Sequence, residues 1–328
     1  MKNHTEVIKG MAPFVEENLG LLKTVEDSWQ PSDILPDMTS EDWKDRVEGL
    51  RKQARAVPDD ILVALLGNTV TEEALPSYQT MINRHPGLSD ETGAADSSWA
   101  RWSRGWTAEE NRHGEILNRY LYLSGRVDMR AFEVTVQNLL RNGFDPGTGN
   151  DPYKGLIYTS FQERATKVSH GNTARLANEC GEPLLGKICA LVTGDESRHE
   201  EAYKRFVGKI AQEDPSGAVV AFAQMMKRMI TMPARRMADG KAPDLFAQFA
   251  AVAQRIGVYT VRDYADILEH LVGYWNIAAL TGLSGDAAEA QDYLGGLAAR
   301  YRALADRGEA KPAASSKAAF SWIFNRAA

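Results

Sequence analysis

The sequence contains little cysteine, no long apolar run and no surplus of positive charge. Two cysteines in 328 residues are too few for a disulfide framework or a cysteine-based zinc site, so a reducing compartment is the default expectation. The most apolar stretches, such as 61–66 and 218–226, are far shorter than the roughly 20 residues that a membrane-spanning helix needs. The formal net charge of −6 argues against a broad nucleic-acid-binding surface, so any basic docking patch must be local.

The N-terminus also lacks the features of a targeting segment. It has neither the apolar core of a signal peptide nor the Arg- and Ser-rich composition of a transit peptide. We therefore expect a cytoplasmic protein, with the plastid stroma after processing as the alternative.

Helical spacing of apolar residues dominates the chain from 58 to 308. Residues 1–57 predict an N-terminal segment with short helices interrupted at Pro31 and Pro36. Residues 309–328 predict a flexible linker rich in Ala, Ser and Lys, followed by a docked apolar tail at 320–324. No stretch alternates with a period of two for long enough to indicate a sheet. The sequence therefore predicts one all-α domain with about ten helices.

The most informative motif is Glu-x-x-His, which occurs at Glu110-x-x-His113 and again at Glu196-x-x-His199. A spacing of three places both side chains of each pair on one face of a helix. In both cases the pair stands within a stripe of apolar residues, where core positions are expected. Because a buried, unpaired carboxylate is very costly, two such pairs facing inward require a compensating cation.

Two further segments offer matching carboxylates. A predicted helix over 58–84 carries Glu72, and another over 155–177 carries Glu163, so a lone Glu precedes each Glu-x-x-His pair. Ferritin-like carboxylate bundles take one Glu from each of two helices and Glu-x-x-His from each of the other two. Mixed oxygen and nitrogen ligation suits iron that must meet O₂. We therefore predict a ferritin-like four-helix bundle with additional helices, holding two Fe (Fe²⁺/Fe³⁺) per chain through Glu72, Glu110, His113, Glu163, Glu196 and His199.

Plainer interpretations of these residues remain open. Thr69 and Glu72 fit a helix-capping box, as do Thr193 and Glu196, although the apolar stripe upstream of Glu196 argues against a helix start there. Glu163 alone is more often a surface residue, and the two motif histidines could be hydrogen-bonded core residues.

Longer stretches around these residues resemble the soluble acyl-acyl-carrier-protein desaturases best known from plant plastids. The segment Tyr-Thr-Ser-Phe-Gln-Glu-Arg-Ala-Thr at 158–166 is one example. The other matching segments are 71–76, 106–114, 120–128, 169–174, 195–199, 258–266 and 320–324. The resemblance runs from about Trp29 to the C-terminus, nearly the whole chain.

This resemblance implies an enzyme that inserts a cis double bond into a saturated acyl chain carried on acyl carrier protein. It further implies O₂ as oxidant, two electrons from ferredoxin, and a homodimer. The family's six iron ligands fall on the six residues named above without substitution. The alternatives are an iron-storage protein of the ferritin type or another di-iron oxidase; a ferritin would need neither an acyl channel nor a carrier dock.

Other residues near the expected centre are candidates for supporting roles. Thr166, one turn after Glu163, could assist proton delivery, or could simply bond its own helix backbone. Asp195 could accept the free N–H of a ligand histidine, or could be an acidic surface residue. Trp29 and Trp106 are candidates for electron transfer, although large aromatic residues at helical spacing are more often core.

The acyl channel and the carrier dock involve further predicted residues. The channel wall is expected to include Met81, Arg84 and His85; plant members usually carry smaller or apolar residues at the last two, which leaves chain length and double-bond position open. Because acyl carrier protein is acidic, its docking surface is expected to be basic, although a solvated helix face explains each basic cluster equally well. The candidates are Arg46, Arg51, Lys52 and Arg55, and also Lys227, Arg228, Arg235 and Arg236.

Overall fold

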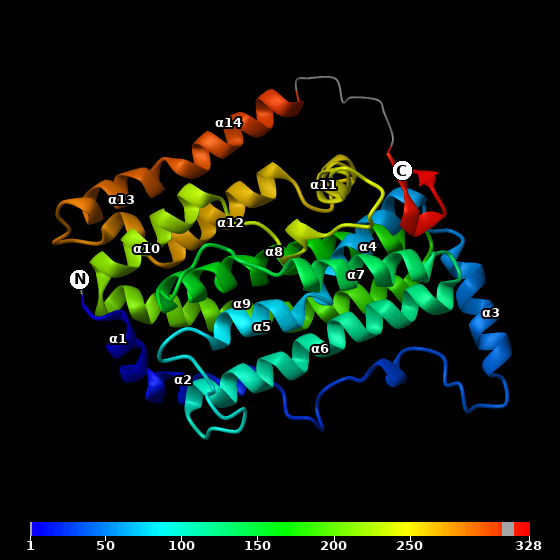
Figure 1. Cartoon of the computed structure of the whole chain (residues 1–328), viewed down its shortest axis with the longest axis horizontal. Helices are drawn as coiled ribbons and strands as arrows, with labels where there is room; N and C mark the ends of the chain where they lie inside the picture. Colours follow the sequence, from blue (N-terminus) through cyan, green and yellow to red (C-terminus); the bar gives the residue numbers. More distant parts are fainter. Residues whose placement is uncertain (1, 310–317) are drawn as a thin grey trace.

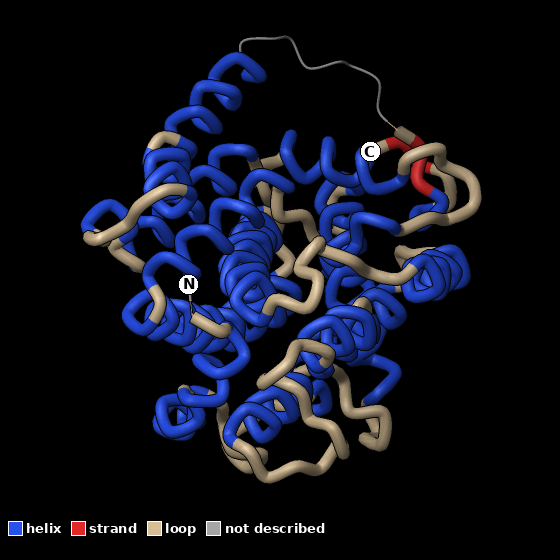
Figure 2. The backbone as a smooth tube through the Cα atoms, turned by 60° about the vertical axis from the view of Figure 1, so that its left-hand side comes forward, coloured by secondary structure: helices blue, strands red, loops and turns tan. Residues whose placement is uncertain are grey.

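The computed structural model describes residues 2–309 and 318–328. Most of this part of the chain is helical (Figure 2). Within it, the strands are β1 (Ala319–Phe320) and β2 (Arg326–Ala327), which pair in antiparallel fashion near the C-terminus. Most of the predicted linker, residues 310–317, lies outside the described residues.

Four helices form the centre of the molecule, and the three longest of them run along its long axis (Figure 1). They are α4 (Asp59–Glu72), α6 (Ser98–Ser124), α8 (Pro152–Glu179) and α9 (Pro183–Glu213). Contacts join α4 to α6, α6 to α9, α9 to α8 and α8 back to α4. This closed ring of contacts is a four-helix bundle, and it confirms the predicted all-α fold.

Local sequence signals set the ends of these helices. Ser97 caps α6 by accepting a hydrogen bond from the backbone N–H of Ala100, and the helix stops at Gly125, which has a left-handed φ of 65°. The two longest helices, α8 and α9, each begin with a proline, whose missing N–H costs nothing in the first turn.

The predicted single helix over 58–84 is wrong, because α4 ends at Glu72 and a separate α5 (Leu75–Asn83) follows. Pro76 lies in the first turn of α5, where its lack of an N–H is tolerated, whereas a continuous helix would need that N–H. The capping-box alternatives are wrong as well. Thr69 donates its hydroxyl to the Leu65 carbonyl inside α4, and Thr193 does the same to Cys189 within α9.

Further helices surround the bundle, and the described residues hold fourteen α-helices rather than about ten. The sequence missed several short ones, whose few turns give weak periodicity. The remaining α-helices are α1 (His4–Gly10), α2 (Ala12–Asn18), α3 (Trp43–Ala54), α7 (Met129–Asn142), α10 (Pro215–Arg228), α11 (Leu245–Arg255), α12 (Val261–Tyr274), α13 (Asp286–Gly295) and α14 (Leu297–Glu309). The 3₁₀ helices are η1 (Leu19–Leu21), η2 (Pro31–Asp33), η3 (Pro233–Arg236), η4 (Ile277–Ala279) and η5 (Ser321–Ile323).

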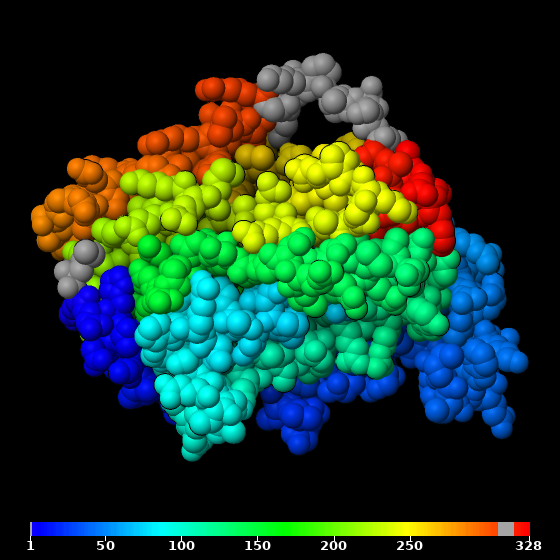
Figure 3. All heavy atoms as spheres, viewed as in Figure 1, coloured from blue at the N-terminus to red at the C-terminus, as the bar shows by residue number. Residues whose placement is uncertain are grey.

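The C-terminal tail packs onto the bundle at the end of the molecule opposite α1, where Figure 3 shows it in red. Trp322 is fully buried and donates its indole N–H to the Thr135 hydroxyl at 2.9 Å. Arg326 pairs with Asp59 at the start of α4, with 2.7 Å between Nε and Oδ2. In the part of the chain that the structure describes, no helix is both long enough and apolar enough to cross a membrane.

Candidate metal centre

The six predicted ligand residues come from the four bundle helices and point into the bundle interior. Each of the six is at most 4% exposed. The helix α4 provides Glu72, α6 provides Glu110 and His113, α8 provides Glu163, and α9 provides Glu196 and His199. The structure therefore brings together all six side chains that the sequence singled out.

The six residues form two overlapping groups, each able to surround one cation. In each group, one ligand atom per residue lies within 4.8 Å of every other. Glu110 and Glu196 belong to both groups. The groups are Glu72, Glu110, His113 and Glu196, and Glu110, Glu163, Glu196 and His199.

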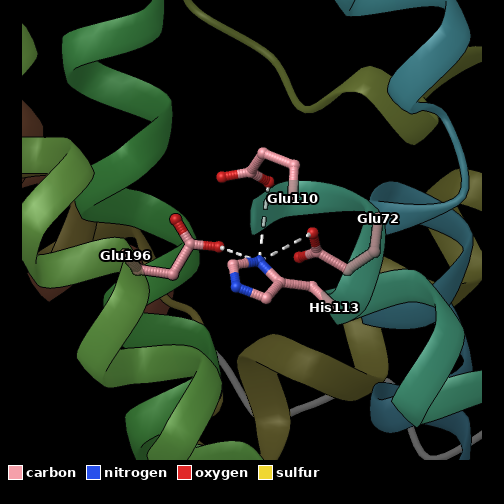
Figure 4. Close-up of side chains that lie close together, drawn as sticks. All are labelled: Glu72, Glu110, His113 and Glu196. Carbon is pink, nitrogen blue, oxygen red and sulfur yellow. Dashed lines mark ion pairs between the residues drawn. The ribbon is translucent and has the colours of Figure 1, made fainter. Parts of the chain in front are cut away.

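Figure 4 shows three carboxylates of the first group converging on Nδ1 of His113. The distances from Nδ1 are 3.9 Å to Glu72 Oε2, 3.6 Å to Glu110 Oε2 and 3.4 Å to Glu196 Oε1. In the second group, Nδ1 of His199 lies 2.7 Å from Glu110 Oε1 and 3.5 Å from Glu163 Oε2.

These close approaches are not hydrogen bonds, although the atoms are buried. Among the described residues, five atoms that face the centre have no hydrogen-bond partner. They are Nδ1 of His113 and His199, Oε1 of Glu110 and Glu196, and Oε2 of Glu163. Each unsatisfied buried polar group costs about 1–3 kcal/mol. Because the five atoms converge, two shared cations would satisfy all of them, and the residues therefore fit a pair of metal ions.

The charges at the centre lead to the same conclusion. Burial raises the pKa of Glu163 well above its usual value, and the nearby Glu110 carboxylate raises it further. Burial also raises the pKa of Glu72, although its contact with His170 partly offsets this. Four neighbouring carboxylates cannot all ionise in a dry interior unless positive charge balances them. Two divalent ions supply the four positive charges that are needed.

Two further carboxylates fix the orientation of the ligand histidines. Asp195 Oδ2 lies 3.3 Å from Nε2 of His113, and Glu109 Oε2 lies 3.0 Å from Nε2 of His199. With Nε2 bonded outward, Nδ1 of each ring is left to face the centre. Asp195 lies on α9 and serves the histidine of α6, while Glu109 lies on α6 and serves the histidine of α9. Each ligand histidine is therefore oriented by a carboxylate from the other helix.

Sequence reasoning found Asp195 but missed Glu109, although a signal was present. The repeat is longer than Glu-x-x-His: Glu109-Glu-Asn-Arg-His113 matches Asp195-Glu-Ser-Arg-His199 in acidic residue, Glu, Arg and His. The arginines of the repeat also take part, since Arg112 and Arg198 donate to Asp195 at 3.2 and 2.9 Å. Burial opposes ionisation of Asp195, but its hydrogen bond to His113 and the nearby Arg198 cation hold its pKa below the usual value.

Three other side chains bind the centre's carboxylates and were not predicted in that role. Nε2 of His170 lies 2.8 Å from Oε1 of Glu72. The indole N–H of Trp106 donates to Glu163 Oε1 at 3.2 Å, and the Tyr78 hydroxyl donates to Glu110 Oε2 at 3.3 Å. The sequence places His170 on the same helical stripe as Glu163, which was the available signal.

The residues predicted to transfer protons or electrons differ in their contacts with the centre. The Thr166 hydroxyl lies 3.1 Å from the backbone carbonyls of both Gln162 and Glu163, so it bonds its own helix. Trp29 is half-buried, donates its indole N–H to Asp195 Oδ2 at 3.0 Å, and stacks on the His113 ring with 6.2 Å between centroids. Trp29 thus links the surface to a ligand histidine, whereas Trp106 is fully buried.

Two cavities adjoin each other, and the smaller one reaches the centre. The first, of about 40 Å³, is lined by four of the cluster's glutamates and by apolar and aromatic side chains of α5, including Met81. Thr166 also lines it. The second, of about 220 Å³, lies among α8, α11, α12 and the segment 229–232, and its lining is mostly apolar. Gln162 lines both cavities.

Arg84 and His85, the other two residues predicted to line the channel, differ in burial. Arg84 is exposed and lies 4.0 Å from Asp145, so the structure does not bring it to the cavity wall. His85 has no exposed surface and lies one turn beyond Met81. Its ring packs so closely against Gly155 that a Cβ added to Gly155 would lie 2.6 Å from it. Both ring nitrogens of His85 lack a hydrogen-bond partner among the described residues, and burial lowers its pKa to about 4.

The two basic clusters lie on different parts of the surface. Arg46 of α3 is paired with Asp42, and Arg55, which directly follows α3, is paired with Glu48. The second cluster brackets the segment 229–232, which lines the larger cavity. Its members Lys227, Arg228, Arg235 and Arg236 are all exposed.

Comparison with known proteins gives matches over nearly the whole chain. A family model described as "Fatty acid desaturase" matches residues 3–324. The chloroplastic stearoyl-[acyl-carrier-protein] 9-desaturase of Brassica napus is 56% identical over 322 residues, which cover 98% of this chain and 81% of that protein. The corresponding protein of Spinacia oleracea is 54% identical with the same coverage. Among solved structures, a Mycobacterium tuberculosis protein described as the acyl-ACP desaturase DesA2 aligns with a TM-score of 0.55 at 20% identity, over 87% of this chain and 99% of that one, and this likeness concerns the fold.

Proposed function

The chain belongs to the fatty acid desaturase family, and from this we propose that it is an acyl-acyl-carrier-protein desaturase with two irons held by the six clustered side chains. The observation that carries the proposal is the position of the two ligand groups beside an apolar cavity. An iron-storage site would need the ligands but would have no use for that cavity.

Iron bound at this site would supply the redox chemistry that converts two adjacent methylenes, O₂, two electrons and two protons into a double bond and two water molecules, which no side chain can do. The protein's own residues hold and orient the reactants. Asp195 and Glu109 keep Nδ1 of each histidine turned toward the metals. Apolar walls, including Met81, position the chain and exclude water.

We further propose that the acyl chain passes through the larger cavity, past Gln162, and into the smaller cavity beside the glutamates. The support is that Gln162 lines both cavities. His85, one turn beyond Met81 and packed on the start of α8, would then close the far end of this path with a neutral imidazole. We also propose that the Thr166 hydroxyl holds a proton near the metals; the support is that Thr166 lines the smaller cavity.

For electron supply we propose a path from the surface through Trp29 to Asp195 and His113, with ferredoxin as the donor. The continuous contacts along these three residues support it. Trp106 is fully buried and bonded to Glu163, which supports a role as a cavity wall and ligand partner instead.

We propose that acyl carrier protein docks on the cluster around Lys227 and Arg228 rather than on α3. The cluster around Lys227 and Arg228 flanks the segment that lines the larger cavity. In the other cluster, Arg46 and Arg55 are already paired with acidic neighbours. Changing Lys227 and Arg228 to Glu should raise KM for acyl carrier protein about tenfold with little change in kcat, because rim charges act mainly on association. The matched control changes Lys52 and Arg55 to Glu, and an equal effect there would contradict the assignment.

The overall function is tested by incubating iron-loaded protein with stearoyl- or palmitoyl-acyl carrier protein, ferredoxin, its reductase and O₂, followed by analysis of the acyl chains. We expect a monounsaturated product. If no chain length gave a double bond, the desaturase proposal would be wrong. Rapid iron uptake without acyl turnover would favour an iron-storage function.

The assembly and location of the protein are also proposals. We propose a homodimer, supported by the family resemblance, and light scattering of the purified protein would measure its mass. The curated relatives are chloroplastic, which supports the plastid stroma over the cytoplasm that the sequence led us to expect. Fractionation of the source cells distinguishes the two locations.

A further inference from the structure

A polar depression that is distinct from the apolar cavities also reaches the metal centre. It has a volume of about 430 Å³ and lies over the break between α4 and α5, against the outer face of α6, which Figure 1 shows beside α5. Six of its ten lining residues are polar or charged, and one of them is Glu72. Glu72 also lines the small apolar cavity. This buried carboxylate therefore stands between an apolar compartment and a polar one.

Carboxylates follow one another from the surface to the centre in this depression. Glu115 is partly exposed at the outer wall, where it is paired with Arg119, which lines the depression as well. Glu73 is half-buried and accepts a hydrogen bond from Asn118 at 2.9 Å, which holds its carboxylate against α6. Glu72 is 3% exposed, and only its Oε1 has a hydrogen-bond partner among the described residues, namely His170. Its Oε2 remains for an incoming cation.

We infer that this depression is the access route by which divalent iron reaches the centre, with Glu73 as the carboxylate that passes the ion to Glu72. The inference rests on the proposed di-iron function. A hydrated cation cannot cross the apolar cavities without losing its water, at a large cost in free energy. A carboxylate replaces part of that hydration and attracts the ion. The break after Glu72 leaves both carboxylates on the wall of the same depression.

The route is also separate from the substrate's path. A bound acyl chain would fill the apolar cavities, but among the residues that line the depression only Glu72 is shared with them. Iron should therefore load at the same rate whether or not the acyl path is occupied.

The experiment follows iron uptake by the metal-free full-length protein under anaerobic conditions. Fe²⁺ is added, the reaction is quenched with a chelator at set times, and protein-bound iron is measured by mass spectrometry. Glu73→Gln removes the charge of the relay, and Asn111→Trp narrows the depression at an exposed position of α6. Glu133→Gln, at an exposed position of α7, is the matched control.

We expect both Glu73→Gln and Asn111→Trp to slow loading about tenfold, while the final iron content stays at two per chain and Glu133→Gln loads normally. Saturating stearoyl-acyl carrier protein should leave the wild-type rate unchanged. Loading rates equal to wild type in both variants would overturn the inference and leave the di-iron proposal intact. A lower final iron content in Glu73→Gln would also overturn it, because Glu73 would then be a ligand. Wild-type protein that takes up no iron would refute the proposed function itself.

Discussion

Replacing His85 should remove a large part of the protein's sensitivity to mild acid. His85 has no exposed surface, and burial lowers its pKa to about 4, with Arg84 lowering it further and Asp151 opposing the change. In the unfolded chain the imidazole returns to its usual pKa of about 6.5. Between these values the unfolded chain binds a proton that the folded protein does not. Folding stability is therefore fully retained above about pH 6.5 and is lost as the pH falls toward 4.

The size of the effect follows from the two pKa values. Proton linkage lowers the free energy of unfolding by about 2 kcal/mol between pH 7.5 and pH 5, and by about 3 kcal/mol once the pH reaches 4. His85→Leu removes both the titration and the two unpartnered ring nitrogens. The variant should therefore equal or exceed wild-type stability at pH 7.5, and should be more stable by at least about 2 kcal/mol at pH 5.

The assay is urea unfolding of matched metal-free samples from pH 5 to pH 8. His85→Gln is the control, because it cannot titrate but keeps a buried polar group; it should flatten the pH dependence without gaining stability at pH 7.5. Parallel stability curves for wild type and His85→Leu across this range would show that His85 is not held neutral by burial, and would refute the reasoning.

The remaining predictions concern the metal centre and the tail. Glu110→Ala should lower bound iron more than Glu72→Ala, since Glu110 belongs to both ligand groups and Glu72 to one; metal analysis would contradict this by finding equal losses. Asp195→Asn should weaken iron binding about 10- to 100-fold without unfolding the protein, as measured by competition with a chelator; unchanged affinity would rule out its orienting role. Arg326→Ala should cost less than about 1 kcal/mol, because its ion pair with Asp59 is partly exposed, yet should speed hydrogen exchange in the tail; unchanged exchange would show that the pair does not hold the tail.

The repeat of Glu-x-x-His made it possible to predict the centre from the sequence, because helical spacing places the two side chains of each pair on one face of a helix. The helical periodicity could not predict which side chains of different helices contact one another. Glu109 precedes Glu110 in the chain and looks like a surface residue, but it bonds a histidine on α9. The break after Glu72 was also missed, since the apolar pattern continues across it and only Pro76 signals a new start. Arg84 and His85 are neighbours in sequence, yet one faces solvent and the other is buried, and this depends on where α5 ends.

The crossed pairing of Asp195 with His113 and of Glu109 with His199 makes the two halves of the repeat interdependent. A fragment that contained only one Glu-x-x-His helix would have an imidazole free to rotate, because its orienting carboxylate lies on the missing helix. Substitutions at Glu109 and Asp195 should therefore combine non-additively. One Glu-x-x-His helix on its own therefore does not form half of the metal site. Each ligand histidine is held in its orientation only when α6 and α9 are packed together.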